Sequence, residues 1–431
     1  MIESSNLRDI PLDVLETIYN NLDVKNACSL NIAINKQIYK SRVSHIRHNI
    51  RLIPKKFHRN IIPITSINQT NIDDGLCDYF YGIYTDRNVN DLTRLTNLKF
   101  LGLSSNHVQD ISFMNNLKEL ILYHVTTPLN LNSFINLTKL NCGYSIIQDV
   151  SNLVNLIELD CQNTSISDVS KLTKLKSLKC NNTKIKDVRM LTSLETLNCS
   201  ETSISDIDNL INLKRLVFSG SFIKSIDHLI NLTYLSCTSC NNIKSIRGFK
   251  YLEYMSINLS ELEVIEDLPE LIRLCITSPK LNTIRNLPKI KILHVNEPFS
   301  SDINDLTSLT NLSCVRSTIS DIKNLINLTW LDCSYSNIIE VNHLINLKTL
   351  SCRDTGITEV NNLINLESLY CNNTPINNID NLVNLIDLTC YNTNICNIVN
   401  QHKLNYLYGD KDKLNVSESI LQNIYNKPNF N

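Results

Sequence analysis

The sequence predicts an α/β solenoid, and two observations carry that prediction. A phrase with the consensus xLxxLxCxxTxIxDIxxLI recurs from residue 97 to about residue 409, in steps of 19 residues with a step of 20 at two points. Within each copy, LxxLxC alternates like a short strand, and apolar residues then return the chain along its other side. One such repeat cannot bury its apolar side alone, so neighbouring repeats must stack into one long core.

Each repeat is expected to place one parallel strand on the concave face and a short 3₁₀ or tight turn on the convex face. Nineteen residues leave room for a strand and one or two tight helical turns, but not for a strand and a full helix. Asp149, Asp168, Asp187 and Asp206 recur at the start of the turn. We expect each carboxylate to cap its own turn rather than to bind calcium.

Ten cysteines share one position of the repeat. A zinc site needs four ligands around one point, and a file of single sulfurs does not provide them. Free cysteine otherwise behaves as a small buried hydrophobe. We therefore expect core packing rather than metal or redox chemistry for the following residues: Cys142, Cys161, Cys180, Cys199, Cys237, Cys314, Cys333, Cys352, Cys371 and Cys390.

The pattern LxxLxCxxTxI resembles the leucine-rich repeat pattern LxxLxLxxNxL, with Cys for the third Leu and Thr for the Asn. The resemblance covers about 16 to 17 repeats and implies a leucine-rich repeat arc. Thr164, Thr183 and Thr355 are among the residues that replace the usual Asn. Their hydroxyls are expected to hydrogen-bond the backbone of the next turn.

The first 50 residues lack the repeat and have apolar residues at helical spacing. Their phrase resembles the F-box, a small helical module that docks on Skp1 in cullin-based ubiquitin ligases. The later Trp of that family is absent here. The resemblance implies that a Skp1-like adaptor contacts the following residues: Ile10, Pro11, Val14, Leu15, Ile18 and Leu22. Alternatively, these helices only cap the open end of the solenoid.

Four segments follow from these patterns. They are an F-box-like helical domain (1–50), a linker with the N-terminal cap (51–96), the leucine-rich repeats (97–409) and a C-terminal cap (410–431). The phrase SESILQNIY in the last segment is expected to form a short amphipathic helix that uses Ile420, Leu421 and Ile424.

Composition restricts the partners. The net charge is −1, there is no apolar signal segment at the start, and no stretch of 18 apolar residues occurs. We expect a monomeric, cytoplasmic protein with reduced thiols and no membrane contact. Residues 24–72 hold nine Lys or Arg and no acidic residue. This stretch is either a solvated linker or a contact for an acidic protein; nucleic acid is disfavoured because aromatic residues are sparse there.

Residues 251–307 keep the period and lose the consensus. Ile257, Ile276 and Val295 replace the core Cys, and Glu261 and Glu266 are among several residues that make this part acidic. These repeats are either tuned for a partner or have drifted.

The sequence offers no catalytic constellation and implies no cofactor or metal. The nine His are scattered, and eight Gly in 431 residues leave no room for a phosphate loop. Binding is instead expected on the outward strand positions of the C-terminal repeats, where residue types typical of binding hot spots gather. These are Trp330, Tyr335, Arg353, Asp354, Tyr370 and Tyr391.

The sequence therefore predicts a non-enzymatic interaction protein. The F-box and leucine-rich repeat pair resembles the F-box/leucine-rich repeat proteins of amoeba-infecting giant viruses. That resemblance implies a substrate adaptor that links a target on the repeats to a Skp1–cullin ubiquitin ligase. The alternative is a plain leucine-rich repeat scaffold.

Overall fold

The computed structural model describes residues 50–54, 80–85, 98–103, 110–240, 242–296, 299, 301–410 and 412–425. The predicted Skp1-binding residues, from Ile10 to Leu22, lie outside this set, as does most of the basic stretch 24–72. The chain divides into two compact units, residues 1–194 and 195–431, which we call unit 1 and unit 2.

Unit 1 carries one strand for each described repeat, preceded by two strands that the sequence did not predict. Strand β1 pairs antiparallel with β2, and β2 begins the parallel series that continues to β7. The strands are β1 (Ile50–Pro54), β2 (Phe80–Thr85), β3 (Phe100–Leu103), β4 (Glu119–Ile121), β5 (Lys139–Asn141), β6 (Glu158–Asp160) and β7 (Ser177–Lys179).

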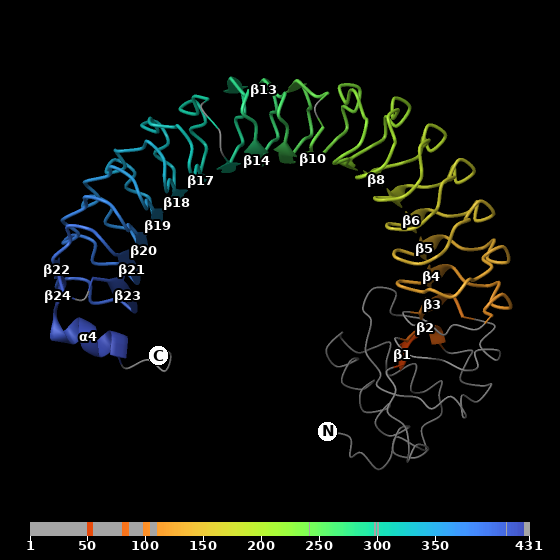
Figure 1. Ribbon diagram of the computed structural model, residues 1–431, viewed down its shortest axis with the longest axis horizontal. Helices are drawn as coiled ribbons and strands as arrows, with labels where there is room; N and C mark the ends of the chain where they lie inside the picture. Colours follow the sequence, from red (N-terminus) through yellow and green to blue (C-terminus); the bar gives the residue numbers. More distant parts are fainter. Residues whose placement is uncertain are drawn as a thin grey trace, which may run out of the picture. The chain divides into compact units, whose positions relative to one another are not determined.

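Unit 2 continues the same plan, with its main sheet on the inner side of the unit's curve (Figure 1). Paired residues lie one repeat apart, so neighbouring strands align Leu312, Leu331, Leu350 and Leu369 in one file. The strands are β8 (Thr196–Asn198), β9 (Arg215–Val217), β10 (Tyr234–Thr238), β12 (Tyr254–Asn258), β14 (Arg273–Thr277), β16 (Ile292–Val295), β17 (Asn311–Ser313), β18 (Trp330–Asp332), β19 (Thr349–Ser351), β20 (Ser368–Tyr370), β21 (Asp387–Cys390) and β23 (Tyr406–Gly409).

The core runs along the inside of the coils, where one coil is one repeat. Leu347, Leu350 and Cys352 are all fully buried, as are Ile357 and Val360 on the returning side of the same coil. The nine ladder cysteines other than Cys237 each have a Ser or Thr three residues later. All ten ladder cysteines are at most 1% exposed. The prediction that they pack in the core is confirmed.

The outer side of most coils is a tight turn, as predicted. In a typical coil the N–H of Leu325 donates to the carbonyl of Ile322, and the N–H of Leu328 donates to that of Leu325. The predicted Asp caps are confirmed: the carboxylate of Asp168 accepts the N–H of Ser170 at 2.8 Å. Hydrogen bonds from the Ser170 backbone and then its side chain lower the pKa of Asp168.

The middle of unit 2 departs from this plan. Here the outer turn is replaced by a second parallel sheet of β11 (Ser245–Arg247), β13 (Val264–Glu266) and β15 (Thr283–Arg285). Ile246 of β11 and Ile265 of β13 are buried. Several acidic residues of this region are paired with basic residues: Lys280 binds Glu261 at 2.6 Å, and Arg285 binds Glu266 at 2.7 Å. This pairing favours a structural role for these carboxylates.

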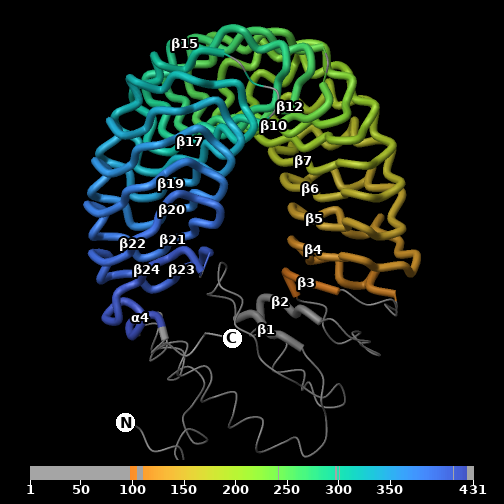
Figure 2. The backbone as a smooth tube through the Cα atoms, turned by 60° about the vertical axis from the view of Figure 1, so that its left-hand side comes forward, coloured from red at the N-terminus to blue at the C-terminus, as the bar shows by residue number. Residues whose placement is uncertain are grey.

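Unit 2 closes with a small cap. Strands β22 (Asn397–Ile398) and β24 (Asn415–Val416) pair in parallel, and helix α4 (Glu418–Tyr425) follows them. The helix buries Ile420 and Ile424, as their spacing predicts, and leaves Leu421 half-buried. Figure 2 shows the coils of unit 2 stacked one on another from β10 to β24, with α4 at the end.

Candidate functional site: the strand face of unit 2

The outward-pointing residues of the main sheet of unit 2 form a continuous surface, which we call the strand face. Along β18, for example, Leu331 is buried while Trp330 and Asp332 on either side of it are half-buried. The alternation repeats from coil to coil because the register is in phase. A partner lying across this surface would therefore meet parallel files of side chains.

The structure brings together only part of the predicted C-terminal site. The guanidinium carbon of Arg353 lies 5.5 Å from the ring centroid of Tyr370 in the next coil. Trp330 begins β18, two strands from the strand that carries Tyr370, and its ring lies 6.3 Å from that of His294. Tyr391 directly follows β21 and is 45% exposed.

Two other predicted residues, Tyr335 and Asp354, lie on the turn that follows the strand. Both have left-handed backbone angles, with φ of 59° and 53°. The guanidinium carbon of Arg316 lies over the Tyr335 ring, 5.3 Å from its centroid. The carboxylate of Asp354 accepts a hydrogen bond of 2.9 Å from the side-chain amide of Asn373 in the next coil. These residues form the rim of the strand face rather than its centre.

Sequence reasoning missed an ordered stack at the other end of the strand face. The rings of Tyr234 and Tyr254 lie parallel, with centroids 4.5 Å apart and an angle of 2° between the planes. The guanidinium carbon of Arg215 is 3.4 Å from the Tyr234 centroid, and that of Arg273 is 5.7 Å from the Tyr254 centroid. We call these four residues, from strands β9, β10, β12 and β14, the arginine–tyrosine stack.

The arginine–tyrosine stack is preorganised for contact. Each guanidinium lies against the negative face of a ring, an attraction worth about 0.5–1 kcal/mol at an exposed site. The rings are half-buried and both arginines are exposed. Burial, and then the charge of Arg273, lower the pKa of the neighbouring His294. The face around the stack therefore presents fixed aromatic surface under positive charge.

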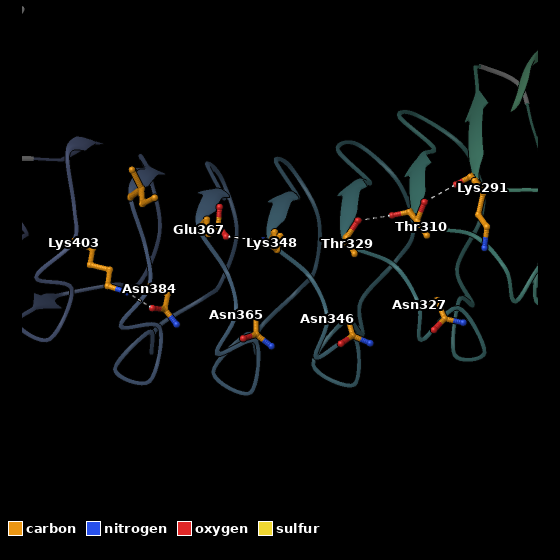
Figure 3. Close-up of a pocket in the computed structure, with 11 residues that line it drawn as sticks. Lys291, Thr310, Asn327, Thr329, Asn346, Lys348, Asn365, Glu367, Asn384 and Lys403 are labelled. Carbon is orange, nitrogen blue, oxygen red and sulfur yellow. Dashed lines mark hydrogen bonds and ion pairs between the residues drawn. The ribbon is translucent and has the colours of Figure 1, made fainter. Parts of the chain in front are cut away.

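A groove of about 760 Å³ lies beside the strand face, at the edge where the chain enters the strands. Figure 3 shows Asn327, Asn346, Asn365 and Asn384 in a file along it. Each donates its side-chain amide to a carbonyl of the preceding coil, for example Asn365 to Ile345 at 2.9 Å. Because these amides already bond to carbonyls of neighbouring coils, they stabilise the stacking of the coils. They are therefore poor donors for a ligand in the groove.

One prediction about the repeat was wrong, namely that the Thr residues bond between coils. The four Asn residues along the groove, which we call the Asn file, do so instead. Thr hydroxyls were expected to bond the backbone of the next turn, as the usual Asn would. Instead Thr355 donates to the carbonyl of Cys352 in its own coil at 2.7 Å, and Thr164 does the same to Cys161. The left-handed residue before each Thr folds the hydroxyl back onto the strand end. The first residue of the repeat, often Asn, bonds between coils.

The described residues contain no group of three His, Cys, Asp or Glu that could hold a metal ion. Burial raises the pKa of the Cys314 and Cys390 thiols to about 12, which keeps these sulfurs protonated. Within the described part of the chain, no helix has the length and apolar character needed to cross a bilayer.

No protein-family model matches this sequence, and no curated protein sequence matches it. Solved structures do. The functional domain of InlJ from Listeria monocytogenes, which includes a cysteine ladder, is 23% identical; the match covers 83% of this chain and 79% of that one, with a TM-score of 0.48.

Two further solved structures are similar at this level. An internalin (InlF) from Listeria monocytogenes is 24% identical, over 68% of this chain and 87% of that chain, with a TM-score of 0.40. YopM from Yersinia enterocolitica is 17% identical, over 73% and 80%, with a TM-score of 0.44. Likenesses this distant carry no argument about partner or activity. The 19-residue register and the stacked parallel strands of this chain form the solenoid that its leucine-rich repeat pattern predicts.

Proposed function

We propose that the chain is a non-catalytic interaction protein that binds a protein target on the strand face of unit 2. The observation that carries the proposal is the placement of aromatic and Arg side chains on that one face. Arg215, Tyr234, Tyr254 and Arg273 stand at one end and Arg353 with Tyr370 towards the other. Tyr, Trp and Arg supply most binding hot spots because they bury large, rigid contact areas.

The chemistry of the target follows from the charge of this face. The stack itself carries Arg215 and Arg273, and Lys291 directly precedes β16 next to it. Lys214 is paired with Glu195 at 2.7 Å, and Glu253 is the acidic residue among the strand-entry positions of these coils. An acidic protein segment complements this surface and would be steered to it. Aromatic rings within that segment would add to the existing stack.

The finer proposal is that the chain is an F-box adaptor. Its N-terminal segment would dock on a Skp1-like protein through Pro11, Leu15 and Ile18, while the strand face holds the target for ubiquitination. The support is the F-box resemblance of residues 10–36 followed by leucine-rich repeats. The alternative is a leucine-rich repeat scaffold whose N-terminal helices only cap the solenoid.

Co-purification of the full chain with Skp1 distinguishes the adaptor proposal from the scaffold alternative. The test variant carries Pro11→Ala, Leu15→Asp and Ile18→Asp, and the matched control carries Trp330→Ala. The adaptor proposal expects Skp1 to stay with the wild type and the control and to be lost from the test variant. A folded wild-type chain that retains no Skp1 would leave the scaffold alternative.

Target binding is tested separately by crosslinking in cells followed by mass spectrometry, and by affinity measurement once a crosslinked partner is purified. Tyr234→Ala with Tyr254→Ala, and Trp330→Ala with Tyr370→Ala, should each weaken binding by about tenfold or more, or about 1.4 kcal/mol. The control is Ile345→Ser with Ile364→Ser, two exposed turn residues off the strand face. Unchanged affinity in both aromatic variants would refute the proposed surface.

A further inference from the structure

The two guanidinium groups at the ends of the arginine–tyrosine stack carry charge that the protein does not neutralise. Each lies against a tyrosine ring, and among the described residues neither Arg215 nor Arg273 forms a salt bridge with a carboxylate. Both arginines are exposed, so their N–H groups remain open to an acceptor from a partner. The stack therefore offers two positive charges that await a counter-ion.

The sheet fixes the spacing of these two charges. Arg215 pairs in register with Tyr234, Tyr234 with Tyr254, and Tyr254 with Arg273, on four neighbouring parallel strands. The two arginines are therefore three strand spacings apart, or about 14 Å. Contact with the rings restricts both side chains, which would otherwise sample many rotamers. A ligand with two anionic groups at a matching distance can bind both arginines at once.

Small polar side chains stand beside the stack on the same face of the sheet. Two residues after the tyrosines, Ser236 and Ser256 pair in register, and Cys275 continues this file after Arg273. All three are half-buried, and neither serine hydroxyl forms a hydrogen bond with another described residue. These hydroxyls are donors that a ligand held by the arginines could use.

We propose that the arginine–tyrosine stack binds a doubly phosphorylated protein segment whose two phosphoserine or phosphothreonine residues are four positions apart. An extended chain rises about 3.3 Å per residue and alternates its side chains, so these two residues lie on one side, about 13 Å apart. The segment runs across the coils from β9 to β14. This inference rests on the proposed function and names the chemistry of its target.

Phosphate fits this surface better than a carboxylate does. A phosphorylated side chain carries a charge of about −1.5 to −2 and three acceptor oxygens, whereas a carboxylate has one charge and two oxygens. Two oxygens of a phosphate can accept the paired N–H groups of a guanidinium, which leaves the third for a serine hydroxyl. Lys291 adds positive charge at the Arg273 end, and the exposed Glu253 opposes it only in part.

The test measures fluorescence anisotropy of labelled synthetic peptides titrated with the full chain. The peptides are otherwise uncharged and carry two phosphoserines that are two, four or six positions apart; a fourth peptide carries two glutamates four positions apart. The expected result is that the phosphopeptide with four-position spacing binds about tenfold or more tightly than each of the other three, because only it reaches both arginines with phosphate.

Three variants assign the effect to the two guanidinium groups. Arg215→Gln and Arg273→Gln should each weaken binding of the four-position phosphopeptide about tenfold and remove the spacing preference. Arg215→Lys combined with Arg273→Lys keeps the charge and should also remove the preference, because an ammonium group lacks the planar fork. The matched control is Lys224→Gln, which removes an exposed charge from the returning side of the coil that carries Arg215. It should change neither affinity nor preference.

Two outcomes would overturn the inference: equal affinity for all three phosphate spacings, or equal affinity for the phosphate and glutamate peptides. Either outcome is distinguishable from failure of the proposed function. If a crosslinked target still loses affinity with Tyr234→Ala and Tyr254→Ala, the strand face binds a protein and only the preference for paired phosphates is wrong.

Discussion

At the scale of single residues, the ends of many strands are held by a short-range bond from a Thr or Ser hydroxyl. Thr374 donates to the carbonyl of Cys371 at 2.7 Å, and both residues are buried. A buried carbonyl without a donor costs about 1–3 kcal/mol, so the hydroxyl matters more than its single bond suggests. The same bond recurs in coil after coil, with Ser in place of Thr in some.

Removing one of these hydroxyls tests its role. Thr374→Val preserves the side-chain shape and should lower the free energy of unfolding by about 1–2 kcal/mol, because the Cys371 carbonyl loses its donor. Thr374→Ser keeps the donor and serves as the control. The comparison is made by urea denaturation, and a Val variant as stable as the Ser variant would show that the bond is dispensable.

The Asp caps predict a dependence of stability on pH. Hydrogen bonds from the Arg189 side chain and backbone lower the pKa of Asp187 to about 2 from its ordinary 3.8. Because the folded pKa is depressed, this contribution is present above pH 3.8 and is lost as the pH falls from there towards 2. The carboxylate is 49% exposed, so solvent screening holds its contribution below about 1 kcal/mol.

Asp187→Asn keeps the cap and removes the charge. Its unfolding free energy should change less than that of the wild type between pH 5 and pH 2.5, as measured by urea denaturation at each pH. Equal changes in the two proteins would mean that Asp187 contributes nothing to acid sensitivity.

At the scale of elements, the second sheet of unit 2 is joined across its strands by ion pairs. The Glu266 carboxylate on β13 lies between Arg247 on β11, at 3.4 Å, and Arg285 on β15, at 2.7 Å. Glu266 is 8% exposed, whereas both arginine side chains are more than half exposed. This geometry is intermediate between a surface pair and a buried one.

We expect Glu266→Gln to lower the free energy of unfolding by about 1–2 kcal/mol, since two guanidinium groups lose a shared partner. The exposed pair of Glu270 and Lys289, at 2.7 Å, supplies the control. Glu270→Gln should change stability by less than about 0.5 kcal/mol. Similar losses in the two variants would contradict a special role for Glu266.

At the scale of the whole molecule, the repeat made most of the fold predictable. Leu at the second and fifth positions and Cys at the seventh are buried as the spacing requires, and the Asp caps follow from their place before each turn. Strands β11, β13 and β15 were not predicted, because the lost consensus in this region indicates a departure from the plan but does not specify which secondary structure replaces the outer turn. The Asn file escaped notice because its amides act one residue before the Leu-based pattern begins.

The candidate site was less predictable than the fold. Trp330 and Tyr370 are visible as rare residue types at outward positions. Tyr234 and Tyr254 are 20 residues apart rather than 19, and the extra residue hides the fact that they pair in register. Contacts between side chains of neighbouring coils depend on rotamers, which a repeat pattern does not encode.

Because the strands from β17 to β21 pair in phase, unit 2 can lose or gain one whole repeat of 19 residues without a change of register. Excising residues 346–364 would join Ile345 to Asn365, which reproduces the original Ile–Asn junction and gives the Asn365 amide the Ile326 carbonyl that Asn346 now uses. The shortened protein should fold cooperatively and be shorter by one strand spacing, about 4.8 Å. The excision of only residues 346–355 would put apolar and polar positions out of phase. Gain or loss of whole repeats therefore changes the length of the binding surface and leaves the core of each remaining coil unchanged.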